Sequence, residues 1–568
     1  MTAEAKAGKG FTGLAELLAG VPPGETPDLH GAFPRLEETQ LRALEAWGER
    51  RPVERGDLLV VEGESELALP VLLSGRAADV EGFGTPDARV VRVHGPGRFL
   101  GELGVLTGQP PFLTGIVVES GEVLSITADR LRALAAGERA FGDQLLRAFL
   151  VRRWLALGEG VGFRIVGSRY SHETRQLREF AARNRLPHRF VDLEDDPSAE
   201  QLLRQLGLGP EQTPIVLYRS RLLRRPTTAE LAEAFGLRDL SPSEGIHDLI
   251  VVGAGPAGLA AAVYGASEGL DTLVLDTVAP GGQAGRTSCI ENYLGFPAGI
   301  SGDELAERAE LQAEKFGARR ELPAEAVGLR QCDGNYVLRL ADGIELVGRC
   351  VIVATGVRVR RLPVPELEKF EDTCVYYAAT PVEAQQCVGD PVVIVGGGNS
   401  AGQAAVFMAD HAAQVGLVVR EPALEENMSR YLADRIERDS RIAVRLHTEV
   451  ARLEGQRGRL EAVVVKDTGT EKLDRLPARE LMVFIGGTPS TSWLPDSVAV
   501  DQGGYVVTGP AAGAAGGDRD APLPLETSLP GVFAAGDVRS GSVKRVASAV
   551  GEGAMAVRMV HEHLAKTR

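Results

Sequence analysis

Cysteine is scarce in this sequence, and the spacing of the few cysteines does not match a disulfide or metal-binding pattern. There are five, at positions Cys289, Cys332, Cys350, Cys374 and Cys387. An odd number at irregular spacing predicts neither a disulfide framework nor a zinc site, and we assign no metal ligand. We expect most of these side chains to be small buried apolar groups.

Long apolar runs and an excess of basic residues are also lacking. No run reaches the length of about eighteen apolar residues that a membrane span needs. The first twenty residues lack the apolar core of a signal peptide, so we expect a cytoplasmic protein. The formal net charge of -16 argues against binding to nucleic acid or to an anionic membrane, because phosphate surfaces attract Lys and Arg patches.

The remaining composition is typical of a soluble multidomain protein, with 44% hydrophobic and 25% charged residues. A chain of 568 residues is too long for one core and predicts about three to five units. We predict a β-barrel domain over residues 11–156 and an α/β domain over 161–240. A dinucleotide-binding domain is predicted over 246–366 and 489–568, with a second one inserted over 367–488.

Two glycine-rich fingerprints are the strongest motifs, Gly253-Ala-Gly-Pro-Ala-Gly258 and Gly396-Gly-Gly-Asn-Ser-Ala401. Each follows an apolar run, Asp248–Val252 or Val392–Val395, and leads into an Ala-rich helical pattern. This order predicts a strand, a tight turn and a helix whose N-terminus receives a pyrophosphate. Two dinucleotides bound to one chain imply electron transfer between them.

An acidic residue completes the first fingerprint. The apolar strand Thr272–Leu275 ends in Asp276, eighteen residues after Gly258. This spacing predicts a carboxylate that accepts hydrogen bonds from an adenosine ribose.

Residues His247 to Arg568 resemble the low-molecular-weight thioredoxin reductase family along their whole length. The motifs that carry the resemblance are Gly281-Gly-Gln-Ala-Gly285, Ile290–Pro297, Val353-Ala-Thr-Gly356, Gly531–Asp537 and Lys544-Arg-Val546. The resemblance implies a two-lobe Rossmann-like α/β core that binds FAD and a nicotinamide dinucleotide, and a homodimer through the FAD lobe. The residues implied to contact FAD are Gly253, Gly255, Pro256, Ala257, Gly258, Asp276, Gly282, Gln283, Asn292, Thr355, Gly356, Gly536, Asp537, Arg545 and Val546.

The second fingerprint opens the inserted lobe, whose expected ligand is the nicotinamide dinucleotide. Ala401 stands at the third small position, which needs only close packing of helix on strand. Ile485-Gly-Gly-Thr-Pro489 resembles the family's return strand into the FAD lobe. The residues implied to contact NAD(P) are Gly396, Gly398, Asn399, Ser400, Ala401, Arg420, Ile485 and Gly486.

The choice between NADPH and NADH depends on the end of the second strand of this lobe. An acidic residue there favours NAD and a basic one favours NADP. Arg420 occupies that place and can pair with a 2′-phosphate, but the family's His-Arg-Arg cluster is replaced by Val419-Arg-Glu421. We expect NADPH as the electron donor and leave NADH open.

The redox-active dithiol of the family is missing. In the family, hydride passes from nicotinamide to flavin and then to a Cys-x-x-Cys turn, which here reads Tyr377-Ala-Ala-Thr380. Alanine and threonine provide no thiolate for exchange. Cys374 and Cys387 flank the turn thirteen residues apart, and we do not expect them to replace it. Hydride transfer depends mainly on the position of the two cofactors, so we predict no catalytic side chain.

The N-terminal segment alternates short predicted strands with glycine turns and ends in a helical stretch over Ala128–Ala156. The predicted strands are Asp57–Val61, Ala68–Leu73 and Arg89–Val93.

Within it, the segment Gly97 to Gly108 resembles the phosphate-binding cassette of cyclic-nucleotide-binding domains, with Glu102 at the family's ribose-binding carboxylate. The family's phosphate-pairing arginine aligns with Pro111, which has no charge-assisted bidentate contact to offer. Two interpretations stay open: a nucleotide ligand near Glu102, and a barrel that serves packing or dimerisation.

The segment 161–240 alternates predicted strands with predicted helices in the order β-α-β-α-β. These elements are Phe163–Val166, Glu173–Asn184, Phe190–Leu193, Ala199–Leu206 and Pro214–Tyr218.

This order, with Thr213-Pro214 opening a strand, resembles the thioredoxin or glutaredoxin fold and its cis-proline. The family's two cysteines correspond to the turn Ser168-Arg-Tyr-Ser171, which cannot form a disulfide. The resemblance therefore implies a scaffold, peptide-binding or docking module, and a plain α/β linker domain is the alternative.

Together these features predict an NAD(P)H-dependent FAD oxidoreductase that resembles thioredoxin reductase and passes electrons to an unidentified acceptor without an internal dithiol. The acceptor is a small molecule or a redox protein, such as a quinone, oxygen, a ferredoxin or a partner's disulfide. Three alternatives remain: a ferredoxin- or flavodoxin-NADP reductase-like enzyme, a nucleotide- or redox-sensing regulatory flavoprotein, and a thioredoxin-disulfide reductase.

Overall fold

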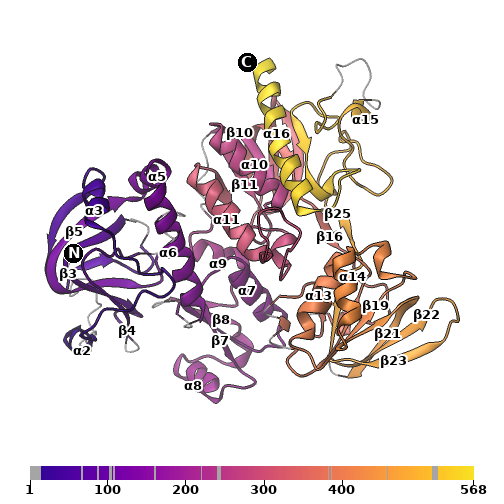
Figure 1. Cartoon of the computed structure of the whole chain (residues 1–568), viewed down its shortest axis with the longest axis horizontal. Coiled ribbons are helices and arrows are strands. Elements are labelled where there is room, and N and C mark those ends of the chain that lie inside the picture. Colours follow the sequence, from indigo (N-terminus) through magenta and orange to yellow (C-terminus); the bar gives the residue numbers. More distant parts are fainter. Residues whose placement is uncertain are drawn as a thin grey trace. The chain divides into compact units, whose positions relative to one another are not determined.

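The computed structural model divides the chain into two compact units, unit 1 (Met1–Ser241) and unit 2 (Pro242–Arg568) (Figure 1). Each unit has its own sheets and its own buried core. The structure describes residues 14–64, 68–85, 88–101, 105, 109–158, 161–218, 221–238, 245–371, 373–380, 383–384, 387–456, 458–513 and 522–567.

The N-terminal part of unit 1 is built on a five-stranded sheet in the order β1-β5-β3-β4, with β2 paired to β5. Side chains alternate between the two faces of each strand, so one face can be wholly apolar. Leu72, Val117 and Val123 on this face are fully buried. The strands are β1 (Glu49–Val53), β2 (Leu58–Val60), β3 (Ala68–Glu81), β4 (Arg89–His94) and β5 (Thr114–Thr127).

In the sequence, two helices precede the strands of this sheet and two helices follow them. They are α2 (Leu14–Ala19), α3 (Glu38–Glu45), α5 (Ala128–Gly137) and α6 (Arg139–Gly158). The prediction of one helix over Ala128–Ala156 is wrong, because Glu138 leaves the helical region with φ -102° and ψ 83°. Gly137 stands just before this break, and glycine is a poor helix former.

The second part of unit 1 carries a four-stranded mixed sheet in the order β7-β6-β8-β9. β6 and β7 run parallel, while β8 is antiparallel to both β6 and β9. The structure contains the predicted order of strands and helices and extends it by β9 and α9. The elements are β6 (Phe163–Gly167), α7 (His172–Arg183), β7 (His188–Asp192), α8 (Pro197–Gln205), β8 (Ile215–Tyr218), β9 (Arg221–Arg224) and α9 (Thr228–Ala234).

An aromatic cluster joins the two parts of unit 1. Phe235, fully buried after α9, lies 4.4 Å from the ring of Phe163 and 4.5 Å from that of Tyr218. It also stacks on Phe112 at 5.9 Å, and Phe112 follows Pro111 in the N-terminal part. The segment between the cassette and β5 therefore contributes to the core of the second part.

Unit 2 consists of two lobes, of which the first contains a seven-stranded sheet in the order β12-β11-β10-β15-β14-β13, with β26 paired to β15. Buried aliphatic clusters cover both faces of the sheet. The elements are β10 (Ile246–Val252), α10 (Pro256–Ser267), β11 (Thr272–Leu275), α11 (Gly302–Lys315), β12 (Arg319–Glu321), β13 (Ala326–Cys332), β14 (Asn335–Leu340), β15 (Glu345–Val353), α15 (Pro510–Gly513), β26 (Val532–Ala534) and α16 (Val546–Thr567).

The second lobe is inserted between β15 and β26. Its parallel sheet has the order β17-β24-β18-β19-β20 and is accompanied by the antiparallel sheet β21-β22-β23. The elements are β17 (Val375–Tyr376), β18 (Pro391–Val395), α13 (Asn399–Ala409), β19 (Gln414–Val418), α14 (Arg430–Arg438), β20 (Ile442–Arg445), β21 (Thr448–Gln456), β22 (Arg459–Asp467), β23 (Leu473–Pro477) and β24 (Glu480–Val483).

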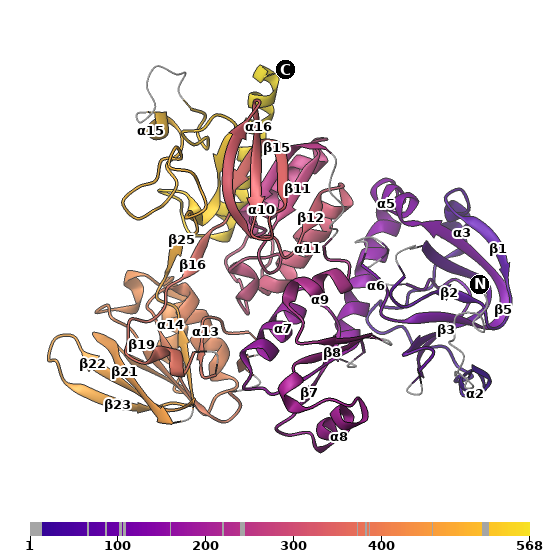
Figure 2. The ribbon, with the colours of Figure 1, turned by 180° about the vertical axis from the view of Figure 1, so that it is seen from behind.

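Two short antiparallel strands, β16 (Val357–Val359) and β25 (Gly487–Pro489), carry the chain out of the first lobe and back into it (Figure 2). The return strand β25 lies within the segment predicted for it. Among the described residues, no helix is both long and apolar enough to cross a membrane.

Candidate functional site

The first fingerprint forms a turn between β10 and α10 that only small residues allow. Gly253 has φ +109°, and a Cβ there would stand 2.3 Å from the carbonyl oxygen of Ala354. A Cβ on Gly258 would stand 1.7 Å from the carbonyl oxygen of Gly253. Helix α10 begins at Pro256, with Gly255 as its N-cap, so its free backbone N–H groups and its dipole favour an anion at this point.

Asp276 holds its carboxylate against this turn. Its Oδ2 accepts a hydrogen bond of 2.9 Å from the backbone N–H of Ala254, the second residue of the fingerprint. Its Oδ1 accepts from the N–H groups of Val278 and Ala279. The carboxylate is thereby placed at the end of β11, beside the glycine turn.

The flavin loop, which we define as the two family motifs Gly281–Gly285 and Ile290–Pro297, approaches the same turn through its backbone. Gly281 and Gly282 have φ of +101° and +55°, and a Cβ on Gly282 would stand 3.0 Å from Cα of Gly255. Two glycines therefore let two backbone segments come together. Gln283 follows directly, whereas Asn292 lies further along the loop with an exposed side chain.

The other predicted FAD contacts lie where β15 and β26 end. Thr355 donates its hydroxyl proton to the carbonyl oxygen of Ser490, and Gly356 has φ +59°. Gly536 donates its N–H to the carboxylate of Glu552 at 2.7 Å. Burial raises the pKa of the neighbouring Asp537.

Arg545 is exposed and Val546 is the first residue of α16. Ala257 lies 4% exposed in the core under α16. A Cβ on Gly553 of α16 would stand 2.1 Å from its carbonyl oxygen, so α10 and α16 pack backbone to backbone.

The second fingerprint repeats this construction in the second lobe. Gly396 has φ +141°, and a Cβ there would stand 2.3 Å from the carbonyl oxygen of Phe484 and 3.2 Å from Cβ of Ala401. Ala401 is fully buried, which explains why the third small position tolerates alanine and little more. Gly398 is the N-cap of α13.

Asn399 and Ser400 differ in what their side chains do. Asn399 accepts a hydrogen bond of 2.7 Å from the N–H of Ser429 and donates one of 3.0 Å to its hydroxyl. It therefore ties α13 to the start of α14. Ser400 is exposed at the first turn of α13, beside the cavity.

Arg420 follows β19 by two residues, and its side chain is 76% exposed. It lies 3.6 Å from the carboxylate of Glu421, whose side chain is only 19% exposed. The arginine side chain is therefore mostly exposed, whereas the adjacent carboxylate is mostly covered.

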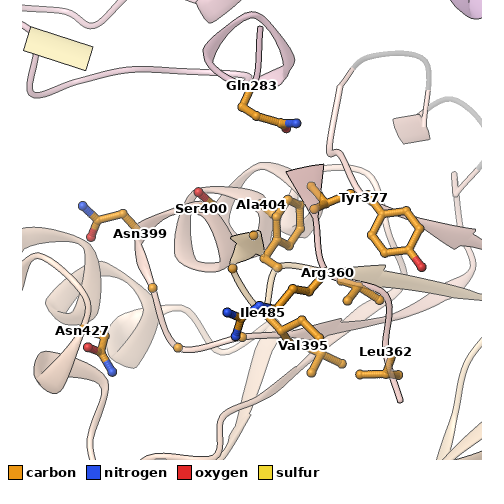
Figure 3. A pocket seen from close by; sticks show the side chains of 18 of the residues that line it. Gln283, Arg360, Leu362, Tyr377, Val395, Asn399, Ser400, Ala404, Asn427 and Ile485 are labelled. Atoms are coloured by element: carbon orange, nitrogen blue, oxygen red, sulfur yellow. The ribbon is translucent and has the colours of Figure 1, made fainter. Parts of the chain in front are cut away.

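A cavity of about 910 Å³ lies between the flavin loop and the second fingerprint (Figure 3). Gln283 projects toward it from the first lobe, opposite Ser400 and Ala404. The lining of the cavity contains ten of the predicted contacts, Gln283, Asp537, Arg545, Gly396, Gly398, Asn399, Ser400, Arg420, Ile485 and Gly486. The predicted contacts outside its lining are Gly253, Gly255, Pro256, Ala257, Gly258, Asp276, Gly282, Asn292, Thr355, Gly356, Gly536, Val546 and Ala401.

Sequence reasoning missed several residues of this lining, including Arg360, Glu421, Asn427 and Tyr505. Arg360 follows the connecting strand β16, and Asn427 precedes α14, so neither belongs to a glycine motif. The N–H of Arg360 donates to the carbonyl oxygen of Gly486 just before β25, and the carbonyl oxygen of Asn427 lies near Gly398, so tertiary packing brings both segments beside the fingerprint.

The turn that replaces the dithiol lies next to the flavin loop. The backbone of Ala379 pairs with that of Thr287 in a parallel bridge. The hydroxyl of Tyr377 donates to Glu371 at 2.5 Å and points away from Gln283 and Ser400 in Figure 3. Burial and this carboxylate raise the pKa of Tyr377, so the phenol stays protonated. Thr380 donates both its N–H and its hydroxyl proton to Glu383.

The cysteines are all free thiols, and three of the five are buried. Cys374 belongs to the core cluster with Leu460 and donates its thiol proton to the carbonyl oxygen of Gly458, whereas Cys387 belongs to the cluster under α13. They belong to different core clusters and form no disulfide.

Two further thiols, Cys350 and Cys289, are poor nucleophiles. Burial raises the pKa of Cys350 to about 12. Burial and Glu291 raise the pKa of Cys289, so this thiol near the flavin loop is protonated at neutral pH. Cys332 is exposed at the end of β13.

In unit 1, the predicted ribose ligand Glu102 lies outside the described residues. Pro111 is buried, and its carbonyl oxygen accepts a hydrogen bond of 2.8 Å from Gly63. Ser168 donates to Glu194, and Ser171 caps α7 by accepting from the N–H of Thr174.

The Thr213–Pro214 bond in unit 1 is cis. A Cβ on Gly167, the last residue of β6, would lie 3.3 Å from Cβ of Pro214. The start of β8 therefore stands beside the serine turn.

These sites define a class of protein. The profile of the family described as "Pyridine nucleotide-disulphide oxidoreductase" matches residues 247–553, and the chain belongs to this family. It is an NAD(P)H-dependent flavoprotein oxidoreductase of the thioredoxin reductase type, a family that uses FAD and NADPH. The profile "Cyclic nucleotide-binding domain" matches residues 50–138.

Individual relatives agree with this assignment. A "34.2 kDa protein in rubredoxin operon" of Clostridium pasteurianum is 32% identical over 317 residues, which cover 56% of this chain and 97% of the relative. The thioredoxin reductase of Treponema pallidum is 32% identical over 318 residues, again 56% and 97%. The crystal structure of Lactococcus lactis thioredoxin reductase is 25% identical with a TM-score of 0.52, and covers 56% of this chain and 99% of that one.

Proposed function

We propose that this oxidoreductase passes electrons from the nicotinamide nucleotide through FAD directly to an acceptor from outside the chain. The observation that carries the proposal is the turn Tyr377–Thr380, which has no thiol and whose Ala379 pairs with Thr287 beside the flavin loop. The flanking Cys374 and Cys387 are buried in separate cores. An internal relay through a disulfide therefore has no residues to use.

The first lobe suits FAD. The backbone cradle leaves no room for a side chain at Gly253 and little at Gly282, and α10 directs its N-terminus toward it. Asp276 would accept hydrogen bonds from the adenosine ribose, and Asp537 would bind the ribityl and phosphate region. FAD, when bound, supplies a carrier that accepts hydride from the nicotinamide and passes electrons on.

The second lobe suits the nicotinamide nucleotide for the same reasons. The N–H groups at the start of α13 would bind the pyrophosphate, and Asn399 would fix that helix through Ser429. Ala378 and Ala379, buried to 2% and 4% exposure, would exclude water from one side of the reaction site without reacting themselves. The other residues assigned from the sequence to FAD and NAD(P) keep the roles given there.

An anaerobic titration tests this proposal. The purified, FAD-loaded protein is titrated with NADPH and then NADH while the visible flavin absorbance is followed. We expect stoichiometric bleaching, and equal bleaching in a variant with all five cysteines changed to serine. Bleaching in the wild type but failed turnover of every acceptor in the variant would restore an internal thiol relay.

The acceptor is then identified by the rate at which it restores the flavin absorbance. A quinone, oxygen, a ferredoxin, a rubredoxin and oxidised thioredoxin form the test set. Rubredoxin is included because the name of the Clostridium pasteurianum relative places that protein in a rubredoxin operon.

The second part of unit 1 is proposed to be a thioredoxin-like module without redox activity. Its parallel pair β6–β7, the cis-Pro214 beside Gly167 and the helix cap at Ser171 support this interpretation. Ser168 donates a hydrogen bond to Glu194 and Ser171 donates one to Glu173, and neither residue can carry redox chemistry. The role that we propose for the module is therefore the docking of a redox partner. Loss of turnover with a protein acceptor, but not with a quinone, on deletion of this module would support that role.

Regulation by a nucleotide is the second candidate function, because the cyclic-nucleotide-binding profile covers residues 50–138. We propose that the N-terminal sheet is a barrel whose ligand, if it binds one near Glu102, does not depend on an arginine–phosphate pair, since Pro111 stands in that place. Calorimetry with cyclic AMP and cyclic GMP tests this. Size-exclusion chromatography with light scattering tests the homodimer, which we propose together with a cytoplasmic location.

A further inference from the structure

The two lobes of unit 2 each place a carboxylate beside the second residue of a glycine fingerprint. In the first lobe this is Asp276, whose Oδ2 lies 2.9 Å from the backbone nitrogen of Ala254. In the second lobe it is Glu421, whose Oε2 lies 2.6 Å from the point where a Cβ on Gly397 would stand. Ala254 and Gly397 occupy the same position in their fingerprints.

The side chain of Glu421 is mostly shielded from solvent, and its main chain is anchored. Its side chain is 19% exposed and its carbonyl oxygen accepts a hydrogen bond of 3.2 Å from the N–H of His447. Both Glu421 and Gly397 line the cavity that contains Ser400. A Cβ at position 397 would require the carboxylate to shift, so the glycine leaves this place beside the turn open to Glu421.

Arg420 cannot decide the donor by itself. Its side chain is 76% exposed, and its nearest acidic partner is Glu421 at 3.6 Å. A 2′-phosphate bound to Arg420 would therefore approach a carboxylate, and like charges at close range repel. A ribose 2′-hydroxyl, in contrast, can donate a hydrogen bond to a carboxylate held beside the glycine turn.

We propose that Glu421 accepts a hydrogen bond from the 2′-hydroxyl of the adenosine ribose and disfavours a 2′-phosphate, so that NADH serves as an electron donor for this chain. The inference rests on the proposed function in one respect, namely that the second lobe binds the nicotinamide nucleotide. It makes Glu421 a specificity-determining residue in a family that uses NADPH.

Calorimetric titration of the FAD-loaded full chain with NAD⁺ and with NADP⁺ tests the proposal without relying on turnover. We expect the wild type to bind NAD⁺ at least tenfold more tightly than NADP⁺. In Glu421→Arg the ratio should shift toward NADP⁺ by at least tenfold, and in Glu421→Gln it should shift in the same direction by less. Glu425→Gln is the matched control, because it removes a carboxylate from the same segment but outside the cavity lining, and its ratio should equal that of the wild type.

Tighter binding of NADP⁺ by the wild type, unchanged in Glu421→Gln, would overturn this inference and leave the proposed function intact. Arg420→Ala then shows whether the arginine holds the 2′-phosphate. If neither nucleotide binds and neither NADH nor NADPH bleaches the flavin, the proposed function fails as well. The two failures are thus distinguishable.

Discussion

Replacing Gly258 by alanine tests whether the close contact in the first fingerprint holds the FAD cradle. The new Cβ would stand 1.7 Å from the carbonyl oxygen of Gly253, so the turn has to move away from α10 by more than an ångström. Alanine gains about 1 kcal/mol of helix propensity over glycine. Overpacking costs about 1–3 kcal/mol, and a net loss of about 1.4 kcal/mol corresponds to a tenfold loss of FAD affinity.

The matched control is Gly551→Ala in α16, where the added Cβ has no atom within 4 Å. It should bind FAD like the wild type and unfold at a slightly higher temperature, because alanine stabilises a helix when it fits without strain. The assay is the dissociation constant of the apoprotein for FAD, measured by flavin fluorescence, with a thermal scan to show that each variant is folded. A folded Gly258→Ala variant that binds FAD as tightly as the wild type would refute the reasoning.

Three further predictions concern stability and movement. Phe235→Ala should destabilise unit 1 by about 3–5 kcal/mol, since a fully buried aromatic ring is removed, and denaturant unfolding followed in that unit should show it while FAD binding is retained. Burial lowers the pKa of His94, so the unfolded state binds a proton on this residue more readily than the folded state does. Unit 1 should therefore lose stability as the pH falls below about 6.5. In melting curves from pH 8 to pH 5, His94→Gln should flatten this dependence. Arg435→Gln removes the pair with Glu291 that links the two lobes at 3.0 Å, and it should change the flavin reduction rate in stopped flow by about two- to fivefold, because a half-exposed ion pair contributes up to about 1 kcal/mol. An unchanged rate would show that the pair does not restrain the lobes.

Much of the core architecture of unit 2 could be predicted because it depends on local backbone chemistry. A glycine with positive φ, followed by a helix that begins at once, leaves few alternatives to a nucleotide turn, and Gly253 and Gly396 both satisfy this. The absence of the dithiol at Tyr377–Thr380 could be predicted from the sequence, since only cysteine provides thiol–disulfide exchange. The interruption at Glu138 could not, because the apolar pattern of helix α5 continues into helix α6.

The sequence by itself determined the two glycine turns, the strand and helix that flank each of them, the absence of exchangeable thiols and the presence of a carboxylate at Asp276. Each of these follows from neighbouring residues and from side-chain chemistry. Only the tertiary structure decided that Arg420 is exposed at the cavity while Glu421 lies beside Gly397, and that Cys374 and Cys387 enter different cores. It also decided that Phe112, just before β5, packs on Phe235. Such contacts join segments far apart in the chain, and their geometry depends on packing that no local pattern specifies.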